Sequence, residues 1–460
     1  MLLIVVPDYA SHYFPMSAIA HHVAALGTEV VVATGPRLRD RVIGDGLFWS
    51  ELRMSQGGNT GVRQPTQHGD DLRPFLASTE AGMVATLLHQ ADARRHDLLW
   101  QPESVAHDTV RLVGRLQPSA VLVDHLCVAA RLGLFAANVR TWTLVPGHPS
   151  QLPGPGEIYG YPTSWPNWVR PDPAGLVELL LRCETTSRMM ADTGNRIVAG
   201  INPSADRIDD VFGALGATVL YNSPSALQDP TRTLPPDHHF LGSCVRAHDV
   251  ADDETQEWLA VREPFLYVSL GTFLSGRVDV LRRIVDGLRR DGRRVAIATG
   301  STSNAQLGAI PAGWLIRPFL PQIELLQHAE GAICHGGNNT VTEALSAGTP
   351  LLILPMSTDQ FAIAADVERS GVGVSADPNS VSAATLAGLA QFGDGTRRRV
   401  VRLASDLARE PGPQLAARLL TGGRRCANSE RGVDVGDVGV HGAGQPSQVD
   451  PQRDRHEPGA

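Results

Sequence analysis

The stretch Leu2-Leu-Ile-Val-Val6 is a continuous apolar run, the pattern of a strand that is covered on both faces of a parallel sheet. Apolar residues recur at helical spacing over residues 16–26, Pro15 suits the first helical turn, and Gly27 supplies a stop. Residues 30–33 form a second apolar run. Because a strand, a helix and a strand in this order imply a right-handed crossover, the sequence predicts a doubly wound α/β sheet.

The strand pattern returns at five places further along the chain. These apolar runs cover residues 120–123, 265–270, 295–298, 332–334 and 351–354. Two sheets, and therefore two domains, are the simplest account of so many strands. Residues 226–250 lie in a segment rich in Pro, Asp and His with little periodicity, so we expect the interdomain linker there. The predicted Rossmann-like domains cover residues 1–225 and 251–424.

Composition narrows the class of protein. The 460-residue chain has a formal net charge of -8 and contains no Lys, which argues against a basic nucleic-acid surface. Five cysteines without Cys-x-x-Cys spacing argue against a disulfide scaffold and a zinc ribbon, and reduced thiols fit a cytoplasmic protein. The apolar start lacks a basic region and meets Pro7 at once, so we expect neither a signal peptide nor stable membrane insertion. Residues 425–460 carry scarcely any large apolar side chain and are predicted to be disordered.

Residues 317–360 carry the most informative motifs. The segments read Arg317-Pro-Phe-Leu-Pro-Gln322, Cys334-His-Gly-Gly-Asn-Asn-Thr-Val-Thr-Glu343, Gly348-Thr-Pro350 and Pro355-Met-Ser-Thr-Asp-Gln360. The second segment has the pattern of a strand, a Gly-rich turn and a helix that begins near Thr340. Such a turn lets backbone N–H groups approach a phosphate closely, and the positive end of the helix favours an anion. The sequence therefore predicts a diphosphate site at this turn.

Two familiar phosphate motifs are missing from the sequence. A Walker A loop needs a Gly-Lys pair, and the dinucleotide fingerprint does not follow the first predicted strand. The four segments instead resemble the donor-binding signature of the inverting UDP-glycosyltransferases, the family of plant secondary-metabolite and bacterial macrolide glycosyltransferases. The likeness is looser across the rest of the chain, where it includes Tyr267-Val-Ser-Leu-Gly-Thr272. It implies the α/β GT-B architecture, in which two Rossmann-like, doubly wound parallel-sheet domains face a cleft.

The resemblance implies a donor site in the second domain. The diphosphate is expected to contact Ser269, Thr272, His335, Gly337, Asn339 and Thr340. Gln322 matches the position near the base and ribose, and Glu343 the one that accepts hydrogen bonds from ribose hydroxyls. Asp359 and Gln360 match the pair that holds the sugar hydroxyls. The family usually stacks its base on a Trp where this chain has Phe319, so both uracil and thymine remain open.

The first domain supplies the expected base. Ser11-His12-Tyr-Phe-Pro15 resembles the family's His-x-x-Pro turn, whose His is the general base on the acceptor hydroxyl. Asp124, which closes the run Ala120-Val-Leu-Val-Asp124, matches the Asp that hydrogen-bonds this His. Both residues also sit at carboxyl strand ends, where a carboxylate can fix the imidazole tautomer and stabilise the imidazolium. The resemblance thus implies His12 and Asp124 as the catalytic pair.

Several of these residues also have a structural alternative. Thr340-x-x-Glu343 is also a capping box, and Asp359 suits the N-cap of a helix. Asn338 and Asn339 suit left-handed turn positions, and His335 at a strand end is alternatively a partner for a backbone carbonyl. The order of these residues within one motif favours the functional interpretation.

The resemblance implies an inverting glycosyltransferase that moves a sugar from a UDP- or TDP-sugar to a hydroxyl of an apolar small-molecule natural product. We expect no cofactor beyond this co-substrate, and no metal, since the chain has no Asp-x-Asp triplet and its adjacent histidine pairs have no further ligands. The alternatives are a glycolipid or sterol glycosyltransferase, a nucleotide-sugar epimerase, and a catalytically silent partner protein with the same fold. The oligomeric state stays open.

Overall fold

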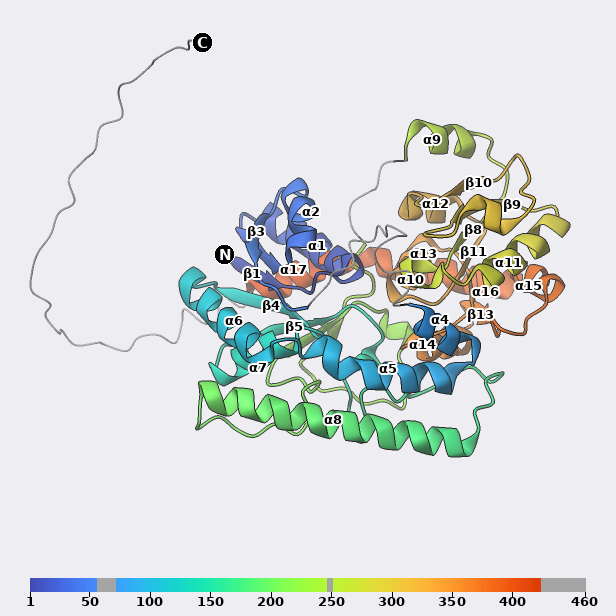
Figure 1. Cartoon of the computed structure of the whole chain (residues 1–460). Coiled ribbons are helices and arrows are strands. Elements are labelled where there is room, and N and C mark those ends of the chain that lie inside the picture. Colours follow the sequence, from blue (N-terminus) through green and yellow to red (C-terminus); the bar gives the residue numbers. More distant parts are fainter. Residues whose placement is uncertain (56–71, 246–250, 423–460) are drawn as a thin grey trace, which may run out of the picture. The chain divides into compact units, whose positions relative to one another are not determined.

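The computed structural model describes residues 1–55, 72–245 and 251–422 (Figure 1). Two parallel sheets lie within one compact unit, Met1–Thr421. This arrangement confirms the prediction of two doubly wound parallel sheets. The tail predicted at residues 425–460 lies outside the described residues.

The first sheet is built from the N-terminal half of the chain. Its strands are β1 (Leu2–Val5), β2 (Val30–Thr34), β3 (Phe48–Glu51), β4 (Ala120–Asp124), β5 (Trp142–Val145), β6 (Thr218–Tyr221) and β7 (His238–Phe240). The helices of this half are α1 (Ala10–Ala25), α2 (Arg39–Gly44), α4 (Arg73–Glu80), α5 (Met83–Leu98), α6 (Pro102–Leu116), α7 (Val128–Ala136) and α8 (Pro173–Ile201), with short 3-10 turns η1 (Pro36–Leu38), η2 (Pro149–Gln151) and η3 (Ser225–Leu227). The strands are parallel in the order β3-β2-β1-β4-β5-β6-β7. The strand order therefore reverses between β1 and β4, which makes a topological switch point.

The second sheet repeats this plan in the C-terminal half. Its strands are β8 (Phe265–Ser269), β9 (Arg294–Ala298), β10 (Leu315–Arg317), β11 (Gly331–Cys334), β12 (Leu351–Ile353) and β13 (Gly373–Ser375). The helices are α9 (Asp253–Ala260), α10 (Gly271–Leu274), α11 (Val278–Arg290), α12 (Gln322–His328), α13 (Asn338–Ala347), α14 (Gln360–Ser370), α15 (Ala383–Leu389), α16 (Asp394–Arg409) and α17 (Gly412–Gly422), with the 3-10 turn η4 (Asn304–Leu307). The parallel order β10-β9-β8-β11-β12-β13 places the second switch point between β8 and β11.

The first sheet extends further along the chain than the boundary predicted at residue 225. Strand β7 pairs with β6 inside the expected linker, residues 226–250. The sequence His238-His-Phe240 gave no strand signal because an edge strand needs only partial burial, and all three residues are half-buried. Of the predicted linker, only residues 246–250 lie outside the described chain.

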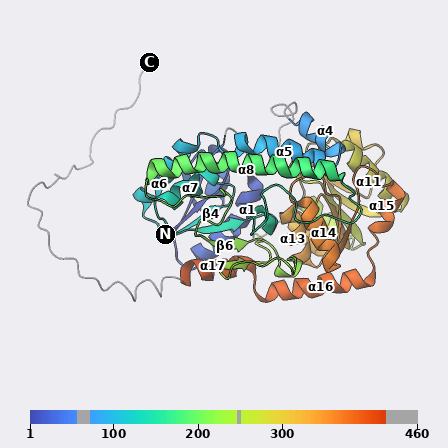
Figure 2. The same cartoon turned by 90° about the horizontal axis from the view of Figure 1, so that it is seen from below.

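The last two helices belong to different halves. Val400 and Leu403 of α16 pack into the core of the second sheet, whereas Ala416, Ala417 and Leu420 of α17 complete the core beneath β1 and β2. Figure 2 shows α16 and α17 following one another along one side of the two sheets. The return of the chain to the first half therefore begins only at α17.

Helices α4, α5 and α8 of the first half also reach the second half. Helices α5 and α8 run side by side in both views (Figures 1 and 2). Phe361 of α14 is buried among their apolar side chains. The buried guanidinium of Arg277 donates to Thr79 Oγ1 of α4 at 3.0 Å and to Asn379 Oδ1 at 2.7 Å. The indole N–H of Trp168 donates to Ser375 Oγ at 2.7 Å. These contacts bind the two halves together away from the switch points.

Candidate active site

His12 and Asp124 meet at the first switch point. Strands β1 and β4 are neighbours in register, so the chain that follows β1 lies beside the end of β4. The His12 Nδ1 atom is 2.8 Å from Asp124 Oδ2. Because a carboxylate only accepts, Nδ1 carries the proton and donates it, which leaves Nε2 of His12 as a free acceptor. The imidazole is 18% exposed while the carboxylate is fully buried, so the arrangement suits a base that a ligand can reach.

Asp124 is ionised by its surroundings. Burial alone would raise the pKa of this carboxyl, but the His12 and His125 imidazoles outweigh burial and hold the pKa well below its ordinary range. The backbone N–H of Leu126 also donates to Asp124 Oδ1 at 2.9 Å. The sequence predicts the first helical turn around Pro15, whereas α1 begins at Ala10, so His12 lies inside the first turn of α1.

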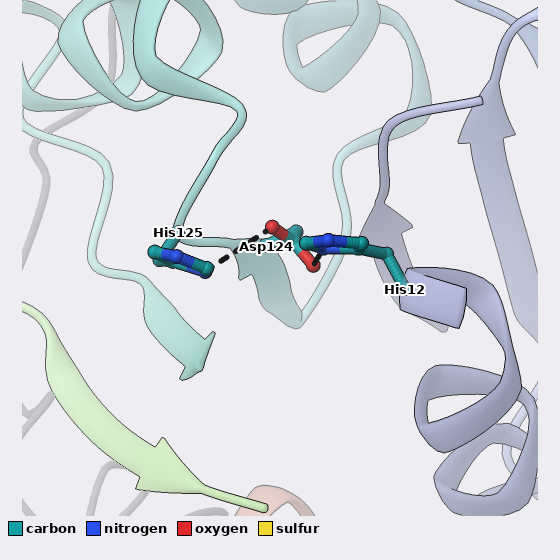
Figure 3. Close-up of side chains that lie close together, drawn as sticks. All are labelled: His12, Asp124 and His125. Carbon is teal, nitrogen blue, oxygen red and sulfur yellow. Dashed lines mark hydrogen bonds and ion pairs between the residues drawn. The ribbon is translucent and has the colours of Figure 1, made fainter. Parts of the chain in front are cut away.

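His125 lies on the other side of Asp124, as Figure 3 shows. Its Nδ1 atom is 3.4 Å from Asp124 Oδ1, and neither ring nitrogen has a hydrogen-bond partner within the described chain. Burial lowers the pKa of His125, so the ring is neutral. Sequence reasoning missed this residue, although its place directly after Asp124 was a signal.

The donor atoms of His12, Asp124 and His125 lie within 4.8 Å of one another. Two imidazoles and a carboxylate form a donor set that a divalent transition metal can use. The expectation of a metal-free mechanism therefore stays a prediction.

The second switch point holds His335. Strands β8 and β11 pair Ser269 with Cys334, so His335 emerges beside the end of β8. The ring fits between two glycines: a Cβ on Gly271 would lie 2.7 Å from His335 Cε1, and one on Gly337 would lie 2.4 Å from Nε2. Burial lowers the pKa of His335 to about 4, and its Nδ1 atom has no partner among the described residues. The neutral imidazole therefore keeps one buried nitrogen, Nδ1, that no described residue uses. Thr272, expected on the same diphosphate, is half-buried at the start of α10.

Helix α13 begins at Asn338, two residues earlier than the sequence suggested. Its N-cap is Gly337, which has no side chain, and Thr340 lies within the first turn. The capping-box interpretation of Thr340 and Glu343 is therefore wrong. The first N–H groups of α13 are free of a side-chain cap and present a site for an anion.

Gln322, Thr340 and Glu343 come together in one polar group. The Gln322 amide donates to Glu343 Oε2 at 2.5 Å and to Thr340 Oγ1 at 3.4 Å. The Tyr267 hydroxyl donates to Gln322 Oε1 at 3.0 Å. Phe319, just ahead of α12, is 49% exposed, so its ring has a face open for stacking. The structure thus gathers the residues that we predicted for the base and ribose.

Asn338 and Asn339 connect the second switch point to the first half. The Asn338 amide donates to the carbonyls of Pro146 at 2.7 Å and Asn222 at 2.6 Å. The Asn339 amide donates to the carbonyl of Ser11 at 2.7 Å. Neither residue has a positive φ, so the left-handed turn interpretation is wrong. The start of α13 is thereby joined to the residue that precedes His12.

Asp359 and Gln360 differ in what their side chains do. Asp359 lies at the N-cap position of α14, but its carboxylate accepts from the backbone N–H of His148 at 2.8 Å and from the Thr358 hydroxyl at 2.9 Å. Asp359 is thus the N-cap residue, as the alternative predicted, but its side chain makes no capping hydrogen bond. Gln360 is 6% exposed, and its amide oxygen accepts from the N–H groups of Met356 and Ser357, each at 3.0 Å. Gln360 stabilises its own loop, and its role on the sugar hydroxyls stays a prediction.

Of two pockets, one is lined by a residue predicted for the site and the other is not. Asp359 lines a cavity of about 80 Å³ together with Ser150, Gln151, Tyr159 and Tyr161. A larger groove of about 510 Å³ lies beside β3 and α6. His12 is not among the residues that line either one.

Solved structures share this architecture. SnogD from Streptomyces nogalater, a glycosyltransferase, superposes with a TM-score of 0.60 at 21% identity over 92% of this chain and 98% of its own. The glycosyltransferase VinC, solved in complex with DTDP, superposes with a TM-score of 0.64 at 17% identity over 94% of this chain and 100% of its own. The two parallel sheets thus have the GT-B fold of these solved glycosyltransferases.

Sequence comparisons give further similarities. Residues 282–421 match the family described as erythromycin biosynthesis protein CIII-like, C-terminal domain. Demethyllactenocin mycarosyltransferase from Streptomyces fradiae is 25% identical over 431 residues, which are 90% of this chain and 84% of the relative. An NDP-glycosyltransferase, YjiC, from Bacillus licheniformis is 28% identical over 39% of this chain and 45% of its own length. Among the described residues, no helix is both long and apolar enough to cross a membrane.

Proposed function

We propose that this glycosyltransferase moves a sugar, with inversion, from a UDP- or TDP-sugar to a hydroxyl of an apolar small-molecule natural product. One observation carries the proposal: the acceptor nitrogen of His12 is left free by Asp124, and the adjoining Ser11 is hydrogen-bonded to the start of α13. A base and an anion site thus meet where two parallel sheets end.

The proposed chemistry is a single displacement. His12 Nε2 removes the proton of the acceptor hydroxyl as its oxygen attacks the anomeric carbon, and the nucleoside diphosphate leaves from the opposite face. The bond to the leaving oxygen breaks as the new glycosidic bond forms, so the configuration inverts. Asp124 holds the imidazole in its reactive tautomer and stabilises the imidazolium. General-base assistance of this kind contributes about 10²–10⁴-fold to the rate.

The leaving diphosphate is stabilised in the second half of the chain. The N-terminus of α13 supplies N–H groups and a positive dipole end, and His335 supplies a neutral hydrogen-bonding nitrogen. We infer that these groups suffice without a divalent ion. Two of the similar structures, VinC and the spinosyn rhamnosyltransferase SpnG, were solved with thymidine diphosphate, which supports TDP as one candidate carrier beside UDP.

The acceptor class rests on the relatives and on the first half. The Streptomyces fradiae relative is named as a mycarosyltransferase of demethyllactenocin, and the matched family is described by erythromycin biosynthesis. Tyr159 and Tyr161 add aromatic surface to the cavity that contains Asp359.

The His12→Ala variant tests this function. It should abolish transfer while nucleoside diphosphate binding, measured calorimetrically with UDP, TDP and ADP, stays within a few-fold of wild type. Full transfer activity in the variant would exclude His12 as the base. If the wild-type protein bound none of the three nucleotides, the proposed function would be wrong.

A further inference from the structure

His148 is buried between the two halves and contacts one helix twice. It follows β5 in the first half and is 7% exposed. Its backbone N–H donates to Asp359 Oδ2, and its Nε2 atom is 2.8 Å from Asp366 Oδ2. Asp359 and Asp366 are seven residues apart, about two turns, so they lie on one face at the start and middle of α14. His148 of the first half therefore contacts α14 at two places, Asp359 at its N-cap and Asp366 in its middle.

The hydrogen-bond pattern fixes the tautomer of His148. The N–H of Ser150 donates to Nδ1 at 3.1 Å, and the Ser150 hydroxyl lies 2.7 Å from the same atom. Nδ1 is therefore an acceptor, and Nε2 carries the proton that it donates to Asp366. Asp366 also pairs with Arg369 at 2.5 Å, and Arg369 donates to the carbonyl of Leu227 in the first half at 2.7 Å. The contact is thus a network with both ends in the acceptor half.

The loop comes unusually close to the Asp359 carboxylate. A Cβ on Gly147 would lie 2.4 Å from Gln151 Oε1 and 2.7 Å from Asp359 Oδ2, so any other residue at position 147 would have to displace these side-chain ends. Two carboxylate contacts, from His148 N–H and Thr358 Oγ, leave acceptor capacity on both oxygens. The carboxylate also lines the cavity shared with Ser150. It remains able to accept from a ligand.

From this geometry we infer that His148 is a positioning residue for the sugar of the donor. Its imidazole fixes the loop on α14 through Asp366, and its N–H then orients the Asp359 carboxylate toward the sugar hydroxyls. Part of the recognition of the donor sugar is therefore carried out by the acceptor half. The inference rests on the proposed function, because it assigns Asp359 to the sugar of a nucleotide sugar.

Two amide substitutions separate the two ring nitrogens. In His148→Gln the side-chain N–H reaches the Nε2 position and restores the bond to Asp366. In His148→Asn the amide reaches only the Nδ1 position, so it accepts from Ser150 and removes the contact of residue 148 with Asp366, which keeps only its pair with Arg369. His148→Ala removes both contacts of the ring, the one with Ser150 and the one with Asp366. His107→Asn, on the exposed face of α6, is the matched control.

The first readout compares ligands with and without the sugar. We expect His148→Asn and His148→Ala to weaken binding of UDP-glucose or TDP-glucose about tenfold or more, the effect of a lost hydrogen bond to a charged group. Binding of UDP and TDP should stay within twofold, and His148→Gln should bind all four ligands like wild type. Equal losses for nucleotide and nucleotide sugar, or no rescue by Gln, would overturn the inference.

The second readout needs no donor. Hydrogen exchange of the backbone amides at residues 146–151 and 356–362 should accelerate in His148→Asn and His148→Ala, but not in His148→Gln or His107→Asn. Unchanged exchange in the Ala variant would overturn the inference by itself. A wild-type protein that binds no nucleotide would instead refute the proposed function and leave the exchange result to judge the contact.

Discussion

Replacing Asp124 by Asn should abolish catalysis although the two side chains have nearly the same size and shape. In the wild-type protein Oδ1 accepts from the N–H of Leu126 at 2.9 Å, and Oδ2 accepts from His12 Nδ1 at 2.8 Å. The amide oxygen of Asn must keep the contact with Leu126, because an NH₂ group facing that N–H would set two donors against each other. The NH₂ group therefore faces His12 and donates to Nδ1. The proton of the imidazole then moves to Nε2, and the base is lost.

The magnitude follows from this tautomer switch. General-base catalysis contributes about 10²–10⁴-fold, and a wrong tautomer in a serine-protease triad costs about 10⁴-fold. We expect kcat of Asp124→Asn to fall about 10³–10⁴-fold, with nucleoside diphosphate binding unchanged. The assay is release of UDP or TDP with whichever hydroxylated polyketide or aromatic acceptor supports wild-type turnover. Asp108→Asn, on the exposed surface of α6, is the control.

The tautomer itself is measurable by ¹⁵N NMR of the histidine ring. His12 should carry its proton on Nδ1 in the wild-type protein and on Nε2 in Asp124→Asn. A variant that keeps its proton on Nδ1, or that keeps wild-type kcat, would refute the reasoning.

Three further predictions concern the donor site. Burial lowers the pKa of His335 to about 4 from an ordinary 6.5, so unfolding takes up a proton between these values. The free energy of unfolding should therefore fall as the pH drops from 6.5 to 4, by at most about 3 kcal/mol, and His335→Gln should flatten this dependence in urea titrations. Gly337→Ala should displace the His335 ring and weaken UDP or TDP binding about tenfold, by calorimetry, whereas Gly313→Ala, which meets open space, should not. Wild-type turnover should persist in EDTA, and strict dependence on added Mg²⁺ would contradict the metal-free mechanism.

Residues at strand ends were predictable because each one follows an apolar run that can be recognised in the local sequence. Apolar runs locate β1, β4, β8 and β11, and in a parallel sheet the residue after each run must emerge at the same edge. Together with the family resemblance, that rule led to His12 beside Asp124 and His335 beside Ser269. The weaker strands, such as β7, carry no apolar run and escaped prediction.

Contacts between the halves were not predictable in the same way. His148 and Asp366 are 218 residues apart, and nothing in the local sequence of either one signals the other. Asn338 is of a residue type that is common in turns, yet its side-chain amide donates to the carbonyls of Pro146 and Asn222 in the first half. Such partners depend on how two separately wound sheets approach each other, which periodicity does not encode. The capping-box alternative for Thr340 failed for a related reason, since α13 begins two residues before the predicted start and the exact first residue of a helix decides which side chain caps it.

The return of α17 to the first sheet sets the order in which the protein can be completed. Ala416, Ala417 and Leu420 cover apolar side chains of the earliest strands, including Leu2 and Ile4. During synthesis α17 is made long after those strands. A nascent N-terminal half therefore exposes apolar side chains that favour aggregation until α17 can pack on them. Chimaeras that exchange donor specificity should therefore be cut twice, near residues 250 and 411, so that each recipient keeps its own terminal helix.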